Sequence, residues 1–597
     1  MNVARRICLA SIVLAVCTLP MQAADVYVST MAAFKSAVNA ATAGTRIFVA
    51  PGTYTGYIYS ENLTGTAANP IKILAQDPKN PPTIDATGQG NGFYLDNCKY
   101  MVIDGLNVQN ASNNSVHVDH SYNMVLRNVN SHDVGGSGHT GNNDTFKIVT
   151  DHDFLFYGCT VSKWGTGGGS GMDIDAAERG LVMKCNFSWP GLASNSGGNN
   201  GFQAKMGSNN IGVYNSTFNN AGDRSLQMGG SSDLNLFGLG NVSYGYEAYQ
   251  MAAMGNTIIS GDASADYSVA RDCAFEYNTL VNPRLRILRA LNENPALGGV
   301  TAFNTFSHNL ISYGSVTEIF NNSGLPGVDF SKFTFDSNYW YKTTNPAGSI
   351  PSVPLGGVLV NNVGGTDPQL NSNYDPQYAA AKNYGADAPG KTAAWLAQVN
   401  KFQWSWDMAQ TFVPHAITGT YAALPGRSVS LNASASTPGQ SSYGNYAFSS
   451  YGWDFNGDGV DDLTSSTPLT SLSYDDLTGT YGLAAGLRTI DLRVCVTDEF
   501  GNPLWSDYTP TTLAIALGGD ANTDGVVTFK DYLILESNFG KSGVMGWAQG
   551  DFNGDGVVSF KDYLILEASF GKSTVPEPAT LAVLALGGLG LLKRHGR

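Results

Sequence analysis

Short strand-like runs recur along most of this chain at a nearly regular spacing. Between about residues 45 and 345, apolar and β-branched runs such as 99–108, 123–130 and 153–161 are separated by Asn and Gly. We take six residues, 23, 30, 26, 30 and 24 positions apart, as equivalent inward-facing positions: Phe93, Val116, Phe146, Met172, Phe202 and Leu226. A period in the twenties with inserted loops predicts a solenoid rather than a sandwich.

Two further details agree with stacked coils. Residues 31–41 are amphipathic and predict a helix that caps the open edge of the first coil. Cys159 and Cys185 are 26 residues apart, the same spacing as Phe146 and Met172, so they should stack in neighbouring coils. We favour buried thiols there over a disulfide.

The composition limits the partners of the chain. Acidic residues outnumber basic ones by 48 to 33, which gives a net charge of −15. No global positive field exists to attract phosphate, so we expect no nucleic-acid partner. Charged residues are only 14 % of the chain and Gly is abundant, which is typical of a turn-rich β structure.

Both ends read as processing signals. Residues 1–24 combine Arg5 and Arg6, a short apolar core and small residues near a cleavage point, as in a secretory signal. Residues 573–597 contain Pro-Glu-Pro, an apolar run over 579–592 and a basic cluster, and they resemble the PEP-CTERM sorting tail of Gram-negative bacteria. That resemblance implies export to the cell surface or an exopolysaccharide matrix, with only a transient membrane contact through the tail.

Residues 25–400 resemble the right-handed parallel β-helix proteins of the polysaccharide lyase and pectin-hydrolase type. The sequence VAPGTYTG at 49–56, the Asn-rich coils, and the motifs GNTI, YNTL and HNLI carry the resemblance. The predicted fold class is therefore all-β, a right-handed parallel β-helix followed by smaller modules. This scaffold hosts lyases, hydrolases, epimerases and adhesins, so the resemblance alone implies no single reaction.

Residues 401–516 have alternating strand patterns and resemble a PKD-like, immunoglobulin-like β-sandwich that serves as a spacer or binding module. A loop with Asp454, Asn456 and Asp458 follows one predicted strand. It is either a further calcium site or a turn without metal, and the β-helix is another candidate place for an additional calcium ion.

Residues 518–572 contain two copies of one loop, 31 residues apart. Oxygen-bearing side chains at positions 1, 3, 5, 9 and 12, with Gly at position 6, follow the EF-hand plan, in which many oxygens surround a hard cation. We predict two calcium ions, held by Asp520, Asn522, Asp524, Thr528, Asp531, Asp551, Asn553, Asp555, Ser559 and Asp562.

Each loop has Asp at position 12 and is followed by a single predicted helix. Together, the two copies resemble a type I dockerin, a small α-helical module. The resemblance implies a cohesin-type partner bound through residues 518–572, at loop positions 10 and 11 and the following helix. Those positions hold Phe529, Lys530, Phe560 and Lys561. The alternative is a calcium-stapled spacer before the sorting tail.

The inward register also predicts a polar face on one sheet. Residues one and three places after each inward position should point outward, and neighbouring coils lie about 4.8 Å apart. Asp173 should then lie between Lys147 and Gln203, and Asp175 beside Lys205. We assign substrate binding to Lys147, Gln203 and Gln227, and a solvated face with ladder ion pairs is the alternative.

Uronate chemistry is the leading functional interpretation. A lyase removes the C5 proton of a sugar acid, so it needs a base and a cation for the carboxylate. Lys205 is a candidate for either role. Residues 200–205 and 219–223 resemble a calcium-dependent pectate lyase segment, with Asn200 at a position where that family has Asp.

A second resemblance, to chondroitinase B and its alginate-lyase relatives, implies a Lys and an Arg one coil apart. Arg286 or Arg289 would match the Arg, and Arg271 is the nearest further candidate base. A glycoside hydrolase would instead use Asp173 and Asp175, which are about 7 Å apart along one strand face. A non-catalytic polysaccharide-binding or matrix scaffold is the third possibility. We therefore expect a secreted β-helix protein that cleaves an acidic polysaccharide by β-elimination.

Overall fold

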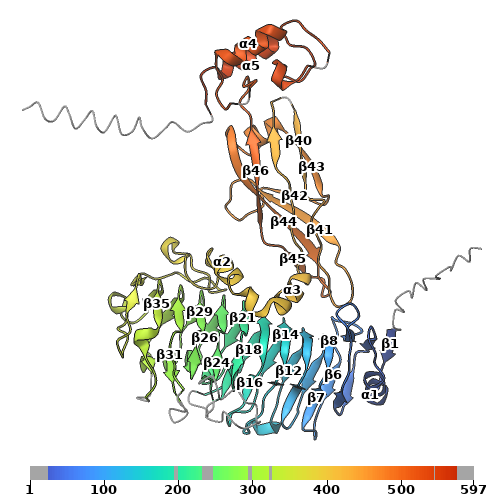
Figure 1. Ribbon diagram of the computed structural model, residues 1–597, viewed down its shortest axis with the longest axis vertical. Helices are drawn as coiled ribbons and strands as arrows, with labels where there is room; N and C mark the ends of the chain where they lie inside the picture. The colour runs from blue at the N-terminus through green and yellow to red at the C-terminus, as the bar shows by residue number, and fades with distance from the viewer. Residues whose placement is uncertain are drawn as a thin grey trace, which may run out of the picture. The chain divides into compact units, whose positions relative to one another are not determined.

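The computed structural model describes residues 25–193, 199–230, 246–292, 299–321, 326–425, 427–522, 524–543 and 545–573 (Figure 1). The predicted secretory signal and all but the first residue of the predicted sorting tail lie outside the described residues. The chain divides into two compact units, one reaching to Ala409 and the other starting at Gln410.

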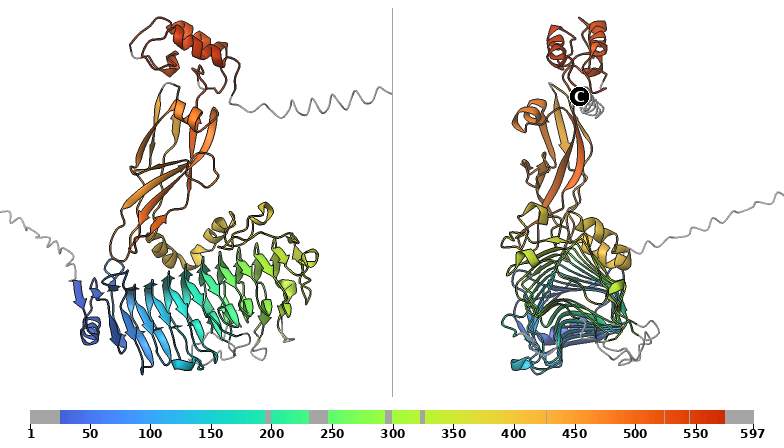
Figure 2. Two further views of the ribbon diagram at one scale, coloured as in Figure 1. Left: turned by 180° about the vertical axis from the view of Figure 1, so that it is seen from behind. Right: turned by 90° about the vertical axis from the view of Figure 1, so that its left-hand side faces the viewer.

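The first unit is a solenoid of three long parallel sheets, and Figure 2 shows its coils from behind and from one end. The sixteen-stranded sheet contains β1 (Asp25–Val28), β2 (Arg46–Val49), β5 (Ile71–Ala75), β8 (Lys99–Asp104), β11 (Tyr122–Arg127), β14 (His152–Tyr157), β17 (Glu178–Met183), β20 (Ser208–Asn209), β21 (Gly212–Tyr214), β24 (Ala248–Tyr249), β25 (Ala252–Met254), β28 (Ala270–Arg271), β29 (Ala274–Glu276), β32 (Thr305–Ser307), β35 (Thr334–Asp336) and β37 (Leu359–Val360).

The other two sheets complete each coil. The ten-stranded sheet contains β4 (Ile58–Glu61), β7 (Asn91–Asp96), β10 (Asn114–Asp119), β13 (Phe146–Val149), β16 (Ser170–Asp175), β19 (Asn200–Lys205), β23 (Arg224–Gly229), β27 (Ala263–Ser268), β31 (Arg286–Leu291) and β34 (Glu318–Asn321). The twelve-stranded sheet contains β3 (Thr53–Thr55), β6 (Thr83–Asp85), β9 (Asn107–Gln109), β12 (Asn130–His132), β15 (Thr160–Ser162), β18 (Asn186–Ser188), β22 (Thr217–Asn219), β26 (Thr257–Ile259), β30 (Thr279–Val281), β33 (Leu310–Tyr313), β36 (Tyr339–Lys342) and β38 (Val363–Gly364).

The predicted inward register is confirmed across the ten-stranded sheet. Phe93 pairs with Val116, and the pairing continues through Phe146 to Met172 and beyond. Phe202 and Leu226 continue the same row, and all six side chains are buried in one apolar core. The loops inserted between strands change the sequence spacing, but the hydrogen-bonded ladder keeps the inward positions aligned.

The coils are also joined by a ladder of buried asparagines. The side-chain amide of Asn256 donates to Oδ1 of Asn278 at 3.0 Å, Asn278 donates to Asn309 at 3.2 Å, and Asn309 donates to Asn338 at 3.0 Å. Each Oδ1 also accepts the backbone N–H of the preceding asparagine. The ladder satisfies polar groups in turns that have no access to water. The first three asparagines belong to the GNTI, YNTL and HNLI motifs.

The solenoid is closed at its first coil by α1 (Met31–Asn39), as the sequence predicts. Thr30 is the N-cap and accepts from the backbone N–H of Ala33, and Phe34 and Val38 are buried against the first coils. Cys159 and Cys185 are buried and free, which confirms the expected pair of core thiols.

The first unit continues past residue 400 because two helices pack on the sixteen-stranded sheet. They are α2 (Lys391–Leu396) and α3 (Gln403–Thr411). Trp395 of α2 stacks on Tyr214 with ring centroids 4.1 Å apart, and Ser405 of α3 donates to the carbonyl of Phe154. These contacts explain why the compact unit extends to Ala409.

The second unit begins with eight strands around their own apolar core. They are β39 (Tyr421–Ala423), β40 (Ser428–Asn432), β41 (Phe448–Asp454), β42 (Leu463–Ser465), β43 (Leu469–Ser473), β44 (Gly486–Thr497), β45 (Pro503–Trp505) and β46 (Thr509–Ile515). Six of them form one sheet, and β40 pairs with β43 in a second one. The PKD-like assignment of this region stays a prediction.

The unit ends in two helices, α4 (Phe529–Asn538) and α5 (Phe560–Ser569), which share a small core that includes Leu535, Trp547 and Leu566. None of the helices in the described part of the chain is long and apolar enough to cross a membrane.

Candidate functional site

A continuous row of polar side chains crosses the ten-stranded sheet, one residue after each inward position. Lys147 pairs with Asp173, and Asp173 with Gln203. Gln203 pairs with Gln227, as the sequence predicts. We define the polar row by its residues, of which the last two extend the prediction: Lys147, Asp173, Gln203, Gln227, Asp266 and Arg289.

The middle of the row is buried rather than solvated. Asp173 is 4 % exposed and Gln227 is fully buried. The backbone at Gly230 comes so close to Gln203 and Gln227 that a side chain there would collide with both amide groups. The expectation of a solvated face therefore does not describe the middle of the row.

Two lysines and three carboxylates form a compact network at one end of the row. The Lys147 ammonium contacts Asp173 and lies 2.6 Å from Asp175 and 3.9 Å from Asp144. The Lys205 ammonium lies 3.1 Å from Asp173 and 3.8 Å from Asp175. Because Asp173 and Asp175 share the Lys147 ammonium, their carboxylates are closer than the ~6.5–9.5 Å of an inverting hydrolase pair.

The charged groups of the network shift one another's pKa values in different directions. Burial would lower the pKa of Lys147 and of Lys205, but the nearby carboxylates outweigh it and raise both values. Burial would raise the pKa of Asp173, but the two ammonium groups lower it. Burial and the Asp173 charge raise the pKa of Asp175, and they raise the pKa of Asp144 to about 7.

These directions decide which groups can exchange a proton near neutral pH. Both lysines remain protonated, so Lys205 is better suited to neutralising a carboxylate than to acting as a base. Asp144 is the network member whose pKa lies closest to neutrality. It was missed by the sequence reasoning because it lies two residues before Phe146, where simple strand alternation places a side chain in the interior.

Other residues that lie two places before an inward position also contact the row or its network. Asn200 contacts Gln203, and Arg224 donates to Gln227 at 3.2 Å. Ser170 donates its backbone N–H to Asp144 at 2.7 Å and so holds that carboxyl in place. A count of the positions two places before each inward residue would have identified them.

The arginine candidates separate into two groups. Arg289 contacts the buried Asp266 and ends the row, whereas Arg286 lies on the same strand outside the row and is 3.6 Å from Glu318. Arg271 lies on β28 in the sixteen-stranded sheet, half exposed, and pairs with Asp272 at 3.3 Å. The structure therefore brings Arg286 and Arg289 to the same sheet as Lys205 and leaves Arg271 apart from them.

Several buried atoms along the row have no hydrogen-bond partner within the described part of the chain. They are Oδ1 of Asp173, Nε2 of Gln227, Oδ1 of Asp266 and Nη2 of Arg289. An unsatisfied buried polar atom costs about 1–3 kcal/mol. Four of them on one row indicate a place where water or a polar ligand supplies the missing hydrogen bonds.

The two loops of the second unit have the donor chemistry that calcium prefers. Asp520 accepts the backbone N–H of Gly525 at 2.9 Å, and Asp551 accepts that of Gly556 at 3.1 Å. The other oxygen of Asp551 is buried with no hydrogen-bond partner among the described residues. Oxygen ligands around one sharp turn, with an orphaned carboxylate oxygen among them, fit a hard cation.

The last predicted ligands of each loop also start a helix. Thr528 and Ser559 are the N-caps of α4 and α5, and each forms a capping box with Asp531 or Asp562. Asp531 also accepts the backbone N–H of Ala521 at 2.9 Å, so it ties the start of its loop to the end. The loop and the helix are therefore one structural unit.

Comparison with known families now agrees with this architecture. A model of the Pel9A-like right-handed β-helix region matches residues 19–160. Residues up to 160 of the first unit therefore match a Pel9A-like right-handed β-helix region. A type I dockerin model matches residues 518–571, and the PEP-CTERM protein-sorting motif matches residues 574–597. A search of curated proteins finds no sequence relative.

Solved structures with a similar fold include several polysaccharide-active proteins. An alginate lyase from Paenibacillus sp. str. FPU-7 is 15 % identical over 52 % of this chain and 97 % of its own, with a TM-score of 0.34. The PL6 family alginate lyase AlyGC is 14 % identical over 68 % and 62 %, with a TM-score of 0.37. Pectate lyase Pel9A is 14 % identical over 51 % and 78 %, with a TM-score of 0.33.

The two C-terminal matches indicate calcium binding and export. Type I dockerin domains bind calcium, so calcium belongs to the chemistry of this chain. The sorting motif identifies an exported protein of a Gram-negative bacterium.

Proposed function

We propose that the β-helix is a secreted polysaccharide lyase that cleaves an acidic polysaccharide by β-elimination on the polar row. The observation that carries the proposal is the row itself, in which partly buried cations and unsatisfied polar atoms are aligned across successive coils. A polysaccharide laid across the strands would meet one row residue per coil, every ~4.8 Å.

The charges of the row suit a uronate rather than a neutral sugar. Lys147, Lys205 and Arg289 are each held at the sheet by a buried carboxylate. A substrate carboxylate can take the place of part of that pairing, and the cations then neutralise the charge that develops when the C5 proton leaves.

The proposal gives each of these residues a role. Lys205 and Lys147 stabilise the uronate carboxylate, and Asp144, with a pKa of about 7, accepts the C5 proton. Gln203, Gln227 and Arg289 position the neighbouring sugars. Arg224 lies on the next coil, level with Asn200 at the other end of the strand from Lys205, and it reaches the row through Gln227.

The test is a panel of uronic-acid polysaccharides incubated with residues 25–597, followed by the ultraviolet absorbance of unsaturated sugar ends. We expect absorbance to rise with one or more substrates, and Lys205→Met and Asp144→Asn each to lower the rate at least about 100-fold. Lys163→Met is the matched control, because Lys163 also pairs with an aspartate, Asp133, but lies on the surface away from the row. Equal rates in all three variants would refute these roles.

Hydrolysis is the second candidate, and one observation favours it. Asp173 and Asp175 have pKa values shifted in opposite directions, which is typical of an acid and base pair. New reducing ends without ultraviolet absorbance would support this reaction. Neither signal over the whole panel would favour a binding or scaffold role.

The C-terminal modules support a surface-attached enzyme. We propose two calcium ions, one in each loop, with ligands from Asp520 to Asp531 and from Asp551 to Asp562. A cohesin-type partner bound through residues 518–572, and a final location at the cell surface or in an exopolysaccharide matrix, are further parts of the same proposal. Isothermal titration of the full chain with calcium tests the stoichiometry of two, and one ion or none would refute it.

A further inference from the structure

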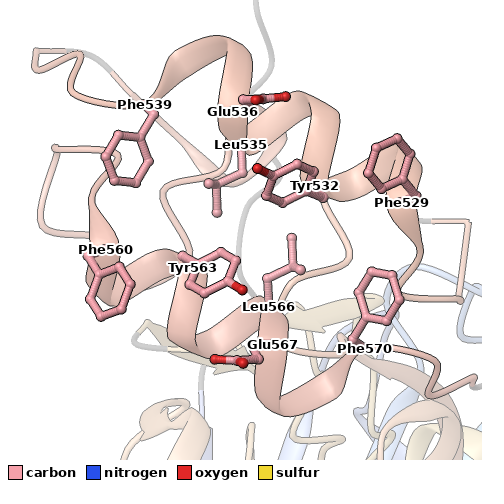
Figure 3. Close-up of a pocket in the computed structure, with 10 residues that line it drawn as sticks. All are labelled: Phe529, Tyr532, Leu535, Glu536, Phe539, Phe560, Tyr563, Leu566, Glu567 and Phe570. Atoms are coloured by element: carbon pink, nitrogen blue, oxygen red, sulfur yellow. The ribbon is translucent and has the colours of Figure 1, made fainter.

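The dockerin region has a large apolar groove between its two helices. The groove has a volume of about 820 Å³, and Figure 3 shows the side chains that line it. They come in pairs 31 residues apart, so α4 and α5, each with the residue that follows it, contribute equivalent residues: Phe529, Tyr532, Leu535, Glu536, Phe539, Phe560, Tyr563, Leu566, Glu567 and Phe570. The groove therefore has approximate two-fold symmetry.

The four phenylalanines of the groove lining are exposed. Phe529 and Phe560 are 62 % and 61 % exposed, and Phe539 and Phe570 are 52 % and 54 % exposed. Figure 3 places Phe529 near Phe570 at one end of the groove and Phe539 near Phe560 at the other. Contiguous exposed aromatic rings at both ends of an apolar groove indicate a surface that is covered by an apolar partner.

We propose that this groove binds the apolar segment 579–592 of the chain's own sorting tail, and that a cohesin-type partner contacts Phe529 and Phe560 only when the tail is out of the groove. The first argument is the place where the described chain ends. Phe570 lines the groove, and the next residues pair with the strand-like segment before α4, since Gly571 donates to the carbonyl of Val527 and Ser573 pairs with Val526. The tail thus starts directly beside the groove.

Length is the second argument. Residues 574–578 separate Ser573 from the apolar segment, and five residues reach up to about 17 Å when extended. The linker is therefore long enough to let residue 579 reach the groove within the same molecule. An intramolecular segment also has a high effective concentration at a neighbouring site.

Charge is the third argument. Glu536 and Glu567 are the charged residues of the groove lining, one from each helix. The tail carries Lys593, Arg594 and Arg597 directly after its apolar segment. An apolar segment followed by a cationic cluster thus complements an apolar groove that carries two carboxylates.

The test uses the full chain, residues 25–597, with calcium. Cysteines replace one groove residue and one tail residue in the pair Phe539→Cys and Leu586→Cys, and disulfide formation under mild oxidation is followed by mass spectrometry. The control pair is Leu533→Cys and Leu586→Cys, since Leu533 lies on the same helix, is 48 % exposed and does not line the groove. The five described native cysteines are buried and free, so they do not compete in the folded protein.

We expect the groove pair to form an intramolecular disulfide at least about tenfold faster than the control pair. Equal rates would overturn the proposal, and so would disulfides that form only between two molecules, because a second copy would then occupy the groove.

A second measurement does not depend on added cysteines. A labelled peptide of residues 574–597 is titrated into residues 25–573 and followed by fluorescence anisotropy. Phe529→Glu with Phe560→Glu should weaken binding at least about tenfold, and Leu533→Glu with Leu564→Glu should change it less than about twofold. No binding, or equal losses in both variants, would refute the tail as the occupant. All four positions are exposed, so none of these changes removes a core side chain.

Discussion

The polar row and the dockerin loops both gather carboxylates, but they neutralise them in different ways. In the row, Asp173 and Asp175 share the ammonium groups of Lys147 and Lys205. In the first dockerin loop, Asp520 and Asp531 accept backbone N–H groups instead. The row therefore carries its own counter-charges, whereas the loops depend on a cation from solution.

The largest expected difference between the two regions is their loss of stability when calcium is removed. Excess chelator takes away a ligand that binds only the folded loops, which costs about 4 kcal/mol per loop at a thousandfold excess over Kd. We expect α4 and α5 to lose their helical circular dichroism and their cooperative thermal transition, with the transition of the β-helix unchanged. A β-helix transition that moves together with the dockerin would contradict this separation.

Removing a counter-charge inside the row should be the next largest effect. Lys147→Met leaves Asp173 and Asp175 facing each other with one ammonium group fewer. Breaking a buried ion pair by removing one partner costs about 3–5 kcal/mol. Urea denaturation measures the loss, and Lys163→Met, which removes an exposed pair, should cost less than about 1 kcal/mol. Similar losses in the two variants would show that the network is solvated.

An effect of comparable size should appear in the pH dependence of Asp144. Its pKa of about 7 in the folded chain lies above the ordinary aspartate value, so the folded state holds the proton more tightly than the unfolded state. The free energy of unfolding should therefore fall as pH rises from about 4 to about 7 and then level off. Asp144→Asn should remove this fall.

The activity of the native chain should show the opposite trend. A base must lose its proton before it can act, so the rate should increase as pH rises through about 7. A flat stability profile from pH 4 to 7 in the native chain would show that Asp144 is charged throughout.

The sequence predicted different parts of the two regions. The predicted ligands of each loop are close together along the chain, so their spacing alone is enough to predict them. The pairing of Asp173 with Lys147 and Gln203 also followed from the sequence, because the inward register is a simple count of two-residue alternation. The approach of Asp144 to the same network did not follow, since alternation breaks down where the chain enters the strand.

Burial and charge pairing were the features that the sequence could not predict. Arg271 and Arg289 have the same chemistry and lie in similar coils, yet they project from different sheets. The burial of Gln203 and Gln227 depends in part on the backbone at Gly230, which is distant from Gln203 in the sequence.

The sequence by itself determined the solenoid, its register and the tandem calcium loops, because these depend on local periodicity and on ligands within a dozen residues. The tertiary structure decided which charges meet, which carboxyl titrates near neutrality and which phenylalanines remain exposed. Those properties depend on distances between coils and helices, and on the loss of water around them, and neither is contained in a local pattern.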